Sequence, residues 1–373
     1  MIIGIPKEIK NNEFRVAMVP KYVRQLIEDN HQVLVETQAG LGVGYSDQDY
    51  LNIGAEIVTS AQAIFAQADM IVKVKEPQAQ ERLMLRSGQI IFTYLHLAPD
   101  LEQTQELMHS QAICIAYETI EDDLGHLPLL APMSEVAGRM AVQVGAHFLE
   151  KPNGGKGILL GGVTGVKPAK VLILGSGTVG KNAAQLALGL EANVTIMTHS
   201  ENSSQKVKAE FGEKVATCVT TTESLHQQIV NADLIVGAVL VPGASTPKLV
   251  TKSQLKQMKP GSVLVDVAID QGGCFETSRP TTHENPTYII DNIVHYCVAN
   301  IPGAVPKTSS VALNNATQEY ILKLANQGYK QALLQNDGFL KGLNIYHGHI
   351  TCENVALSHN LPYSPARTLL ENG

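Results

Sequence analysis

Three glycines of the sequence are spaced as in a phosphate-binding turn. The apolar run Val171–Leu174 leads directly into Gly175-Ser-Gly177-Thr-Val-Gly180, and a helical pattern follows. Between a strand and a helix, the first glycine permits a tight turn, the second lets backbone N–H groups reach a pyrophosphate, and the third allows close helix–strand packing. The helix N-terminus adds a positive dipole. The pattern predicts dinucleotide binding; glycines that serve tight packing alone are the simpler alternative.

The adenosine end of such a site has a gap. A carboxylate that binds the ribose is expected about 20 residues beyond the glycines, at the end of the next strand. That strand ends here in Thr198-His-Ser200 without a carboxylate, and the closest strong cation is Lys206. The gap removes a charge that repels a 2′-phosphate, but no arginine is near to bind one. The residues therefore leave NAD, NADP and weak cofactor binding open.

Further ionisable side chains lie at the carboxyl ends of predicted strands, where ligands bind in parallel sheets. Lys75 ends one apolar run, with Lys73 predicted on the same face; His96 follows a second run, and Asp270 ends a third. A lysine supplies a point charge for an anion. An imidazole titrates near neutral pH and can move protons, and a carboxylate can stabilise a developing positive charge. Solvated surface lysines and a structural histidine are the simpler interpretations.

The elements that must position these residues form two alternating series. In the first, which covers residues 1 to about 130, the apolar pattern predicts strands at Ile2–Ile5, Val33–Glu36, Met70–Lys75, Ile90–Tyr94 and Ala112–Ala116. Apolar residues at three- and four-residue spacing predict helices between them at Tyr22–Asp29, Ala61–Ala68 and Leu101–Ser110. This alternation is typical of a parallel α/β sheet.

A second series follows a long helix of small residues, Met133–Glu150, and a stretch rich in Gly, Pro and Lys that marks a domain crossing. Its predicted strands are Val171–Leu174, Val194–Met197, Leu234–Val236, Val263–Val267 and Tyr288–Ile290. The chain then turns helical at Ser309–Gln327 and continues as a tail. The predicted fold is α/β, with two Rossmann-like domains built on parallel sheets, the second a doubly wound dinucleotide-binding domain.

Composition excludes several classes of protein. The 373 residues are 44% hydrophobic and 17% charged, which suits about two domains with a buried core and excludes disorder for most of the chain. The net charge is −7 without a basic run, which argues against nucleic acid as a partner. The longest apolar stretches are about half of the ~20 residues that span a membrane. With no export signal and five cysteines lacking C-x-x-C spacing, we expect a cytoplasmic protein without membrane contact.

Several segments, in order along nearly the whole chain, resemble the alanine dehydrogenase family. They are Gly4-Ile-Pro-Lys-Glu-Ile, Asn12-Glu-Phe-Arg15-Val-Ala, Val74-Lys75-Glu-Pro, Tyr94-Leu-His96-Leu-Ala, Pro132-Met-Ser134-Glu-Val-Ala, Asp266-Val-Ala-Ile-Asp270-Gln-Gly-Gly and His295-Tyr-Cys-Val-Ala-Asn300-Ile-Pro-Gly-Ala. The resemblance implies a substrate domain of residues 1–130 plus 305–373, an NAD(H)-binding domain of residues 131–304, and a homohexamer. It also implies the reversible oxidative deamination of L-alanine by NAD to pyruvate and ammonium.

The resemblance assigns roles to four side chains. Arg15 and Lys75 match the pair that binds the substrate carboxylate, and an arginine there offers a planar two-point fork. His96 matches the acid/base residue. Asp270 matches the carboxylate that stabilises the iminium and binds the attacking water, whereas Asp266, within the strand, is expected to be structural.

The cofactor contacts that the resemblance implies join the three glycines of the turn. They are Ser134, Gly175, Gly177, Thr178, Gly180, Thr198, Thr220, Val239, Leu240, Val267, Ala268, Ile269, Asp270, Arg279, Val298, Ala299, Asn300 and Ile301. Two positions depart from the family: Thr198 replaces the usual ribose-binding Asp, and Ser203 stands where a Lys is common. Glu118 matches a position that binds a divalent cation in some relatives, but Gln327 replaces its His partner, so no metal is predicted.

Two kinds of alternative stay open. On the same scaffold, an NADP-using or dual-specificity amino-acid dehydrogenase or imine reductase fits the sequence Thr198-His-Ser200. A related fold also forms the NAD-binding part of transhydrogenase. A non-catalytic sensor of cofactor or amino acid is the alternative from another class, and intact Arg15, Lys75, His96 and Asp270 argue against it, because a binding module needs no acid/base pair.

Overall fold

The computed structural model describes residues 1–239 and 246–372. The chain separates into two compact units, one made of Met1–Met133 with Val305–Gly373 and the other of Ser134–Ala304. The first unit is therefore completed by the C-terminal part of the chain. The helix α6 (Ala131–Phe148) runs from the first unit into the second.

Unit 1 is built on a mixed sheet that has eight strands among the described residues, in the order β15-β14-β6-β5-β4-β1-β2-β3. The strands are β1 (Ile2–Ile5), β2 (Gln32–Glu36), β3 (Glu56–Val58), β4 (Met70–Val72), β5 (Ile90–Thr93), β6 (Ile113–Ala116), β14 (Leu343–Tyr346) and β15 (His349–Ile350). The first six are parallel, and β14 and β15 add an antiparallel edge. Residues of β4, β5 and β6 are buried, as expected of a parallel sheet covered on both faces.

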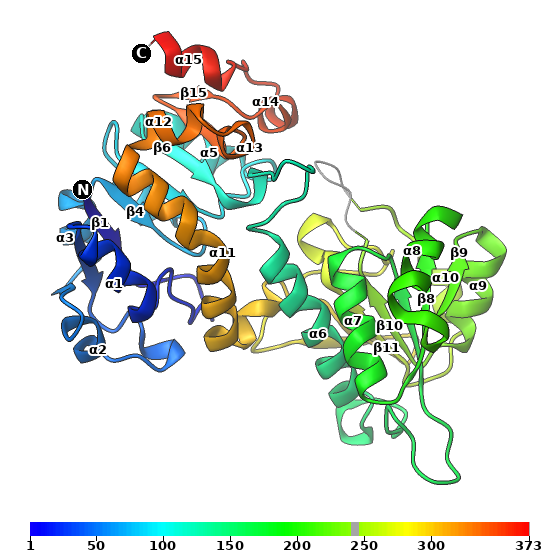
Figure 1. Ribbon diagram of the computed structural model, residues 1–373. Coiled ribbons are helices and arrows are strands. Elements are labelled where there is room, and N and C mark those ends of the chain that lie inside the picture. The colour runs from blue at the N-terminus through cyan, green and yellow to red at the C-terminus, as the bar shows by residue number, and fades with distance from the viewer. Residues whose placement is uncertain (240–245, 373) are drawn as a thin grey trace. The chain divides into compact units, whose positions relative to one another are not determined.

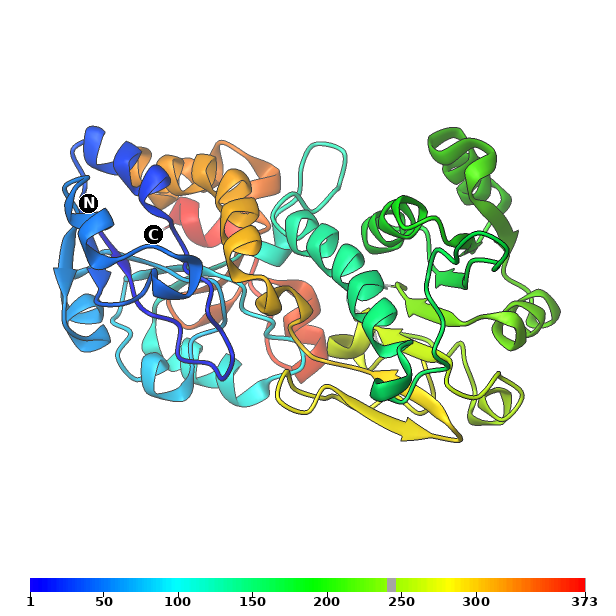
Figure 2. The same cartoon turned by 90° about the horizontal axis from the view of Figure 1, so that it is seen from below.

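Helices cover this sheet, and the C-terminal ones pack beside the N-terminal ones. They are α1 (Pro20–Glu28), α2 (Asp47–Leu51), α3 (Ala61–Gln67), α4 (Ala79–Arg82), α5 (Leu101–Ser110), α11 (Pro306–Gln327), α12 (Tyr329–Leu334), α13 (Asp337–Leu340), α14 (Glu353–His359) and α15 (Ala366–Asn372). Figures 1 and 2 both show α11 alongside α1. Hydrogen bonds join the two helices, including one from the Gln318 side chain to the Tyr22 carbonyl at 3.2 Å.

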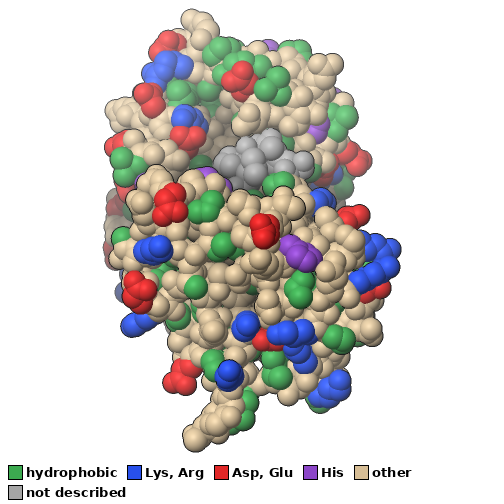
Figure 3. Space-filling view, turned by 90° about the vertical axis from the view of Figure 1, so that its right-hand side faces the viewer, with side chains coloured by type: hydrophobic (Ala, Val, Ile, Leu, Met, Phe, Trp, Pro, Cys, Tyr) green, Lys and Arg blue, Asp and Glu red, His purple; other side chains and the backbone are tan. Residues whose placement is uncertain are grey.

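Unit 2 is built on a second mixed sheet with seven strands among the described residues, in the order β12-β13-β11-β10-β7-β8-β9. The strands are β7 (Lys170–Leu174), β8 (Asn193–Thr198), β9 (Ala216–Val219), β10 (Leu234–Gly237), β11 (Val263–Asp266), β12 (Thr287–Ile290) and β13 (Ile293–Tyr296). Its helices are α7 (Thr178–Gly189), α8 (Glu201–Phe211), α9 (Thr222–Asn231) and α10 (Lys252–Leu255). On the face shown in Figure 3, acidic and basic side chains are interspersed.

Both sheets place their first strand beside the second and the fourth. When only the parallel strands of each unit are numbered in chain order, leaving out the antiparallel β12, β14 and β15, their order in the sheet is 3-2-1-4-5-6. This is the doubly wound order. The α/β expectation is confirmed. Ligands bind such sheets at the carboxyl ends of the strands, next to the point where the order reverses. That point lies between β1 and β4 in unit 1 and between β7 and β10 in unit 2.

The sheets differ from the expected purely parallel ones at their edges. β12 covers the predicted strand Tyr288–Ile290, but it pairs antiparallel with β13, which the sequence pattern did not reveal. Four more strands were also missed, namely β3, β9, β14 and β15. Each has only two to four residues, too few for a distinct apolar period. Among the described residues, no helix combines the length and apolar character needed to cross a bilayer.

Candidate active site

The predicted substrate residues of unit 1 come from three neighbouring loops at one edge of the sheet. Arg15 lies between β1 and α1, Lys75 follows β4, and His96 follows β5. Because β1, β4 and β5 are adjacent and parallel, their following loops emerge at the same edge. The topology thus places two cations and an imidazole at the end of the sheet where α/β proteins bind ligands.

Arg15 is almost fully buried, with 3% of its side chain exposed, and is held by Glu13. Its Nε donates to Glu13 Oε1 at 2.7 Å and its Nη2 donates to Glu13 Oε2 at 2.6 Å. The Arg15 backbone N–H also donates to Glu13 Oε1, at 3.1 Å. Burial lowers the pKa of Arg15, but the bonds to Glu13 outweigh it and raise the pKa overall. The Nε–Nη2 side of the guanidinium is therefore engaged by Glu13, and the role of Arg15 in binding a substrate carboxylate stays a prediction.

Helix α11 fixes the loop that carries Arg15. The Val16 N–H donates to the Ser310 hydroxyl at 3.0 Å, and the Val19 N–H donates to Asn314 Oδ1 at 2.8 Å. Ser310 and Asn314 are buried, so these bonds form away from water. The C-terminal part of the chain therefore orders a loop near the N-terminus.

Lys73 and Lys75 differ in their surroundings, and the structure corrects the expectation that they share a strand face. β4 ends at Val72. Lys73 is wholly buried, with its Nζ 3.0 Å from Glu8 Oε2 and 2.8 Å from Glu81 Oε1. Lys75 keeps 12% of its side chain exposed, and its Nζ lies 3.9 Å from Glu76 Oε2, beyond hydrogen-bond distance. Lys73 is a structural cation, whereas Lys75 has a loosely held charge.

Glu8 connects this ion cluster to the backbone that carries Lys75. Its Oε1 accepts from the Val74 N–H at 2.6 Å and from the Lys75 N–H at 3.4 Å. Burial raises the pKa of Glu8, although Lys73 acts in the opposite direction. The carboxylate of Glu8 therefore holds the chain just after β4.

His96 is exposed at the end of β5 and has a left-handed backbone, with φ of 50°. Its ring stacks on Tyr94, with centroids 5.7 Å apart and planes 2° apart. The Tyr94 hydroxyl donates to the Leu129 carbonyl at 2.5 Å. Glu118, in the short helix η2 (Tyr117–Thr119) after β6, accepts from the His96 N–H at 2.6 Å.

Glutamates 8, 13 and 118 are thus site residues that sequence reasoning missed as a group. Each accepts a hydrogen bond from the backbone N–H of one predicted substrate residue. Glu8 and Glu13 lie within the family-like segments, and the family resemblance connects Glu118 only with a cation site of some relatives. The available signal was their position in or near loops that follow adjacent strands. Among the described residues, no three His, Cys, Asp or Glu side chains group in a way that could hold a metal ion.

The glycine turn of unit 2 has the geometry that its pattern predicts. Gly175 has φ of 109°, and a Cβ there would lie 2.6 Å from the Ala238 carbonyl oxygen. A Cβ on Gly180 would lie 2.0 Å from the Gly175 carbonyl oxygen, whereas a Cβ on Gly177 would meet nothing within 4 Å. No side chain caps α7, whose N-cap is Gly177. Open space beside an uncapped helix N-terminus is what a pyrophosphate needs.

The end of β8 is occupied by local hydrogen bonds. Thr198 is buried, and its hydroxyl donates to the Ser200 carbonyl at 3.2 Å. The Ser200 hydroxyl caps α8 by accepting from the Ser203 N–H at 3.2 Å, and Ser203 Oγ lies 3.3 Å from the His199 ring. The hydroxyls expected to face a ribose therefore have partners within the chain. His199 is the exposed member of this group.

Asp266 and Asp270 differ as expected. Asp266 is buried and accepts from the Cys274 N–H at 2.9 Å and from the Ser278 hydroxyl, so it is structural. Burial raises its pKa. The strand β11 ends at Asp266, one residue before the predicted end at Val267. Asp270 lies on the short helix η5 (Val267–Gln271) that follows, and it is exposed.

Most of the other predicted cofactor contacts of unit 2 lie just after parallel strands, at the sheet edge that also carries the glycine turn. Thr220 follows β9, Val239 follows β10, residues 267–270 follow β11, and residues 298–301 follow β13. Arg279 lies beyond this edge, and its guanidinium stands over the Tyr288 ring at 4.1 Å. Ser134 lies on α6. Leu240 is outside the described residues.

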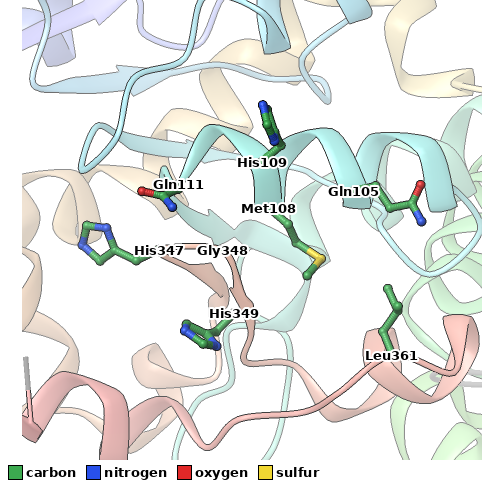
Figure 4. Close-up of a pocket in the computed structure, with 8 residues that line it drawn as sticks. All are labelled: Gln105, Met108, His109, Gln111, His347, Gly348, His349 and Leu361. Atoms are coloured by element: carbon green, nitrogen blue, oxygen red, sulfur yellow. The ribbon is translucent and has the colours of Figure 1, made fainter.

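A pocket of about 560 Å³ lies elsewhere in unit 1, lined by α5, the turn between β14 and β15, and Leu361. Figure 4 shows His109 projecting from α5, and His347 and His349 on either side of Gly348. None of the predicted site residues lines this pocket.

Comparison with known proteins places the whole chain in one family. The N-terminal domain described as "Alanine dehydrogenase/PNT" matches residues 4–137, and the corresponding C-terminal domain matches residues 141–353. The chain is 52% identical to proteins named alanine dehydrogenase from Halomonas elongata and Methanococcus maripaludis, over 99% of this chain and 100% of each relative.

Solved structures agree with this placement. A structure titled L-alanine dehydrogenase superposes with a TM-score of 0.93 at 49% identity, covering 96% of this chain and 99% of that one. A transhydrogenase from Sinorhizobium meliloti has a TM-score of 0.82 at 23% identity, covering 94% of this chain and 100% of that one, which shows a shared fold.

Proposed function

The chain belongs to the alanine dehydrogenase family, and we propose that it converts L-alanine, NAD and water reversibly into pyruvate, ammonium and NADH. The observation that carries this proposal is the meeting of Arg15, Lys75 and His96 at one sheet edge, in a chain 52% identical over its length to alanine dehydrogenases. A carboxylate-binding pair beside an acid/base residue suits a small 2-amino acid.

The residues of unit 2 fit a dinucleotide. The open space at Gly177 and the uncapped N-terminus of α7 suit a pyrophosphate, and the other predicted contacts follow the strands of the same sheet edge. When bound, NAD accepts a hydride from the substrate Cα. We therefore assign substrate binding to unit 1 and cofactor binding to unit 2.

Arg15 and Lys75 hold the substrate carboxylate in this proposal. Because Nε and Nη2 of Arg15 donate to Glu13, the arginine contacts the substrate through the Nη1–Nη2 edge of its guanidinium in this proposal. Lys75 needs little rearrangement to bind, since its Nζ lies 3.9 Å from Glu76 and is not tightly paired. The two cations fix the orientation of Cα and of the amine.

His96 and Asp270 manage the protons and the charge. We assign proton transfer to His96 Nε2, because Nδ1 is the nitrogen that lies 3.8 Å from Glu118. It removes the proton from the substrate ammonium before the hydride leaves Cα, and it serves again when water adds to the imine and ammonia departs. The Asp270 carboxylate stabilises the iminium and accepts a hydrogen bond from that water.

The test is a two-way assay of the purified protein by NADH absorbance. We expect turnover of L-alanine with NAD, and of pyruvate with ammonium and NADH. If no turnover occurs while NAD still binds by calorimetry, the alanine assignment fails, and another substrate or a sensor role takes its place.

An NADP-linked activity on the same site is the second candidate. It is favoured by the absence of a carboxylate at the end of β8, where Thr198 stands. It is weakened by the local hydrogen bonds of Thr198 and Ser200. Running the same assay with NADP and NADPH separates the two, because the preferred cofactor gives the higher kcat/KM.

The family resemblance also supports a cytoplasmic homohexamer. Light scattering coupled to size-exclusion chromatography measures the number of chains directly. A monomer at assay concentrations contradicts the hexamer without affecting the proposed reaction.

A further inference from the structure

The backbone at His96 needs external support. Its φ of 50° lies in the left-handed region, which only a few per cent of residues other than glycine adopt, although His is among the types found there more often. Such a conformation persists only where the surroundings hold it, and it is often found at functional sites. The loop after β5 must therefore contain the groups that fix His96.

Glu118 supplies that support from one side of the loop. Its Oε1 accepts from the His96 N–H at 2.6 Å and from the Leu95 N–H at 3.2 Å, and its Oε2 lies 3.3 Å from the Leu95 nitrogen. One carboxylate thus binds two consecutive backbone N–H groups. Glu118 Oε1 lies 3.8 Å from Nδ1 of the His96 ring, farther than from the His96 backbone nitrogen. Glu118 therefore acts on His96 mainly through the backbone.

Gln103 holds the loop from the other side. Its side-chain amide donates to the Leu95 carbonyl at 2.6 Å, and Gln103 is 1% exposed. The peptides around Leu95 and His96 are therefore fixed through both their N–H and C=O groups. Glu118 can reach them because β5 and β6 are paired, with Thr93 opposite Ala116, and η2 follows β6 directly.

We propose that Glu118 is a positioning residue: its carboxylate fixes the left-handed backbone of His96 and so aims the imidazole at the substrate. This inference rests on the function proposed above. It assigns Glu118 a role in catalysis that needs no metal ion. The Glu118 side chain is 14% exposed, and its removal leaves no buried cation without a partner. The N–H of buried Leu95 does lose this acceptor, so thermal melts must first show that each variant is folded.

The test compares Glu118→Ala, Glu118→Gln and a control, Glu121→Ala, in the full chain. Glu121 lies three residues further on and pairs with the exposed Lys341. We expect Glu118→Ala to lower kcat by about 10- to 100-fold, the scale of a misplaced catalytic group. The KM for pyruvate should stay within about twofold, because Arg15 and Lys75 are untouched.

Glu118→Gln should restore kcat to within about threefold of the unaltered protein, because one amide oxygen can accept from both N–H groups as Oε1 does. Glu121→Ala should match the unaltered protein. A full kcat in Glu118→Ala, a KM that rises in proportion to the loss, or a failure of Gln to restore kcat in the folded protein overturns the proposal.

Hydrogen exchange by mass spectrometry gives a second measurement that does not depend on activity. We expect faster exchange in the peptide that contains Leu95 and His96 in Glu118→Ala and not in Glu121→Ala. Unchanged exchange in Glu118→Ala overturns the proposal even if the unaltered protein proves inactive on pyruvate, an outcome that would count against the proposed function alone.

Discussion

Lys73 and Lys75 lie two residues apart, yet the structure predicts opposite consequences when each is replaced by methionine, which keeps the length of the side chain. Lys73→Met leaves Glu8 and Glu81 facing each other without the cation that lies 3.0 and 2.8 Å from them. Removing one partner from a buried ion cluster costs about 3–5 kcal/mol. We expect the free energy of unfolding to fall by that amount.

Lys75→Met removes a charge that is loosely paired in the free protein. Its Nζ is 3.9 Å from Glu76, which keeps Lys10 as a second cation, so the free energy of unfolding should change by about 0–1 kcal/mol. A charged hydrogen bond to the substrate carboxylate contributes about 1.5–3 kcal/mol. Its loss lowers kcat/KM for pyruvate by about 10- to 150-fold.

Urea denaturation and steady-state kinetics on the same preparations measure both quantities. Lys10→Met is the matched control, because Lys10 pairs with the same Glu76 but is 40% exposed, and we expect it to change neither. The reasoning is refuted if Lys75→Met destabilises the protein as much as Lys73→Met does. It is also refuted if Lys75→Met changes kcat/KM by less than about threefold.

Further predictions concern unit 2. Gly177→Ala should raise the KM for the cofactor at least about tenfold with an unchanged melting temperature, because the added methyl enters open space where the pyrophosphate is proposed to bind. Gly180→Ala should lower the melting temperature, because its added methyl meets the backbone carbonyl oxygen of Gly175. Burial lowers the pKa of His295 below its ordinary 6.5, so the unfolded chain binds more protons than the folded one just below that pH. The free energy of unfolding should therefore fall as the pH drops below 6.5, and His295→Gln, followed by thermal melts across this range, should lessen that fall. Thr198→Asp should lower kcat/KM for NADPH relative to NADH by about tenfold, because a carboxylate repels the 2′-phosphate; an unchanged ratio would place the ribose elsewhere.

Much of the fold and the placement of the candidate site residues at strand ends follow from the sequence alone, because they depend on local patterns. Short apolar runs, with residues at helical spacing between them, predict two βαβ series. The glycine turn is a contiguous motif, and it has the predicted geometry. Lys75 and His96 were predicted at the ends of strands, and that placement puts them at one edge of a parallel sheet.

Only the tertiary structure decided how the site is held together. The strand β4 ends at Val72, so the predicted pairing of Lys73 with Lys75 on one face fails, and Lys73 is buried between two glutamates. The bond from Val16 to Ser310 joins residues 294 positions apart, and that from His96 to Glu118 spans 22. Burial and the partners of hydrogen bonds depend on which segments meet in space, and a local pattern carries no record of those meetings. The types of the candidate site side chains are therefore visible in the sequence, whereas the hydrogen bonds by which Glu8, Glu13 and Glu118 hold them are visible only in the fold.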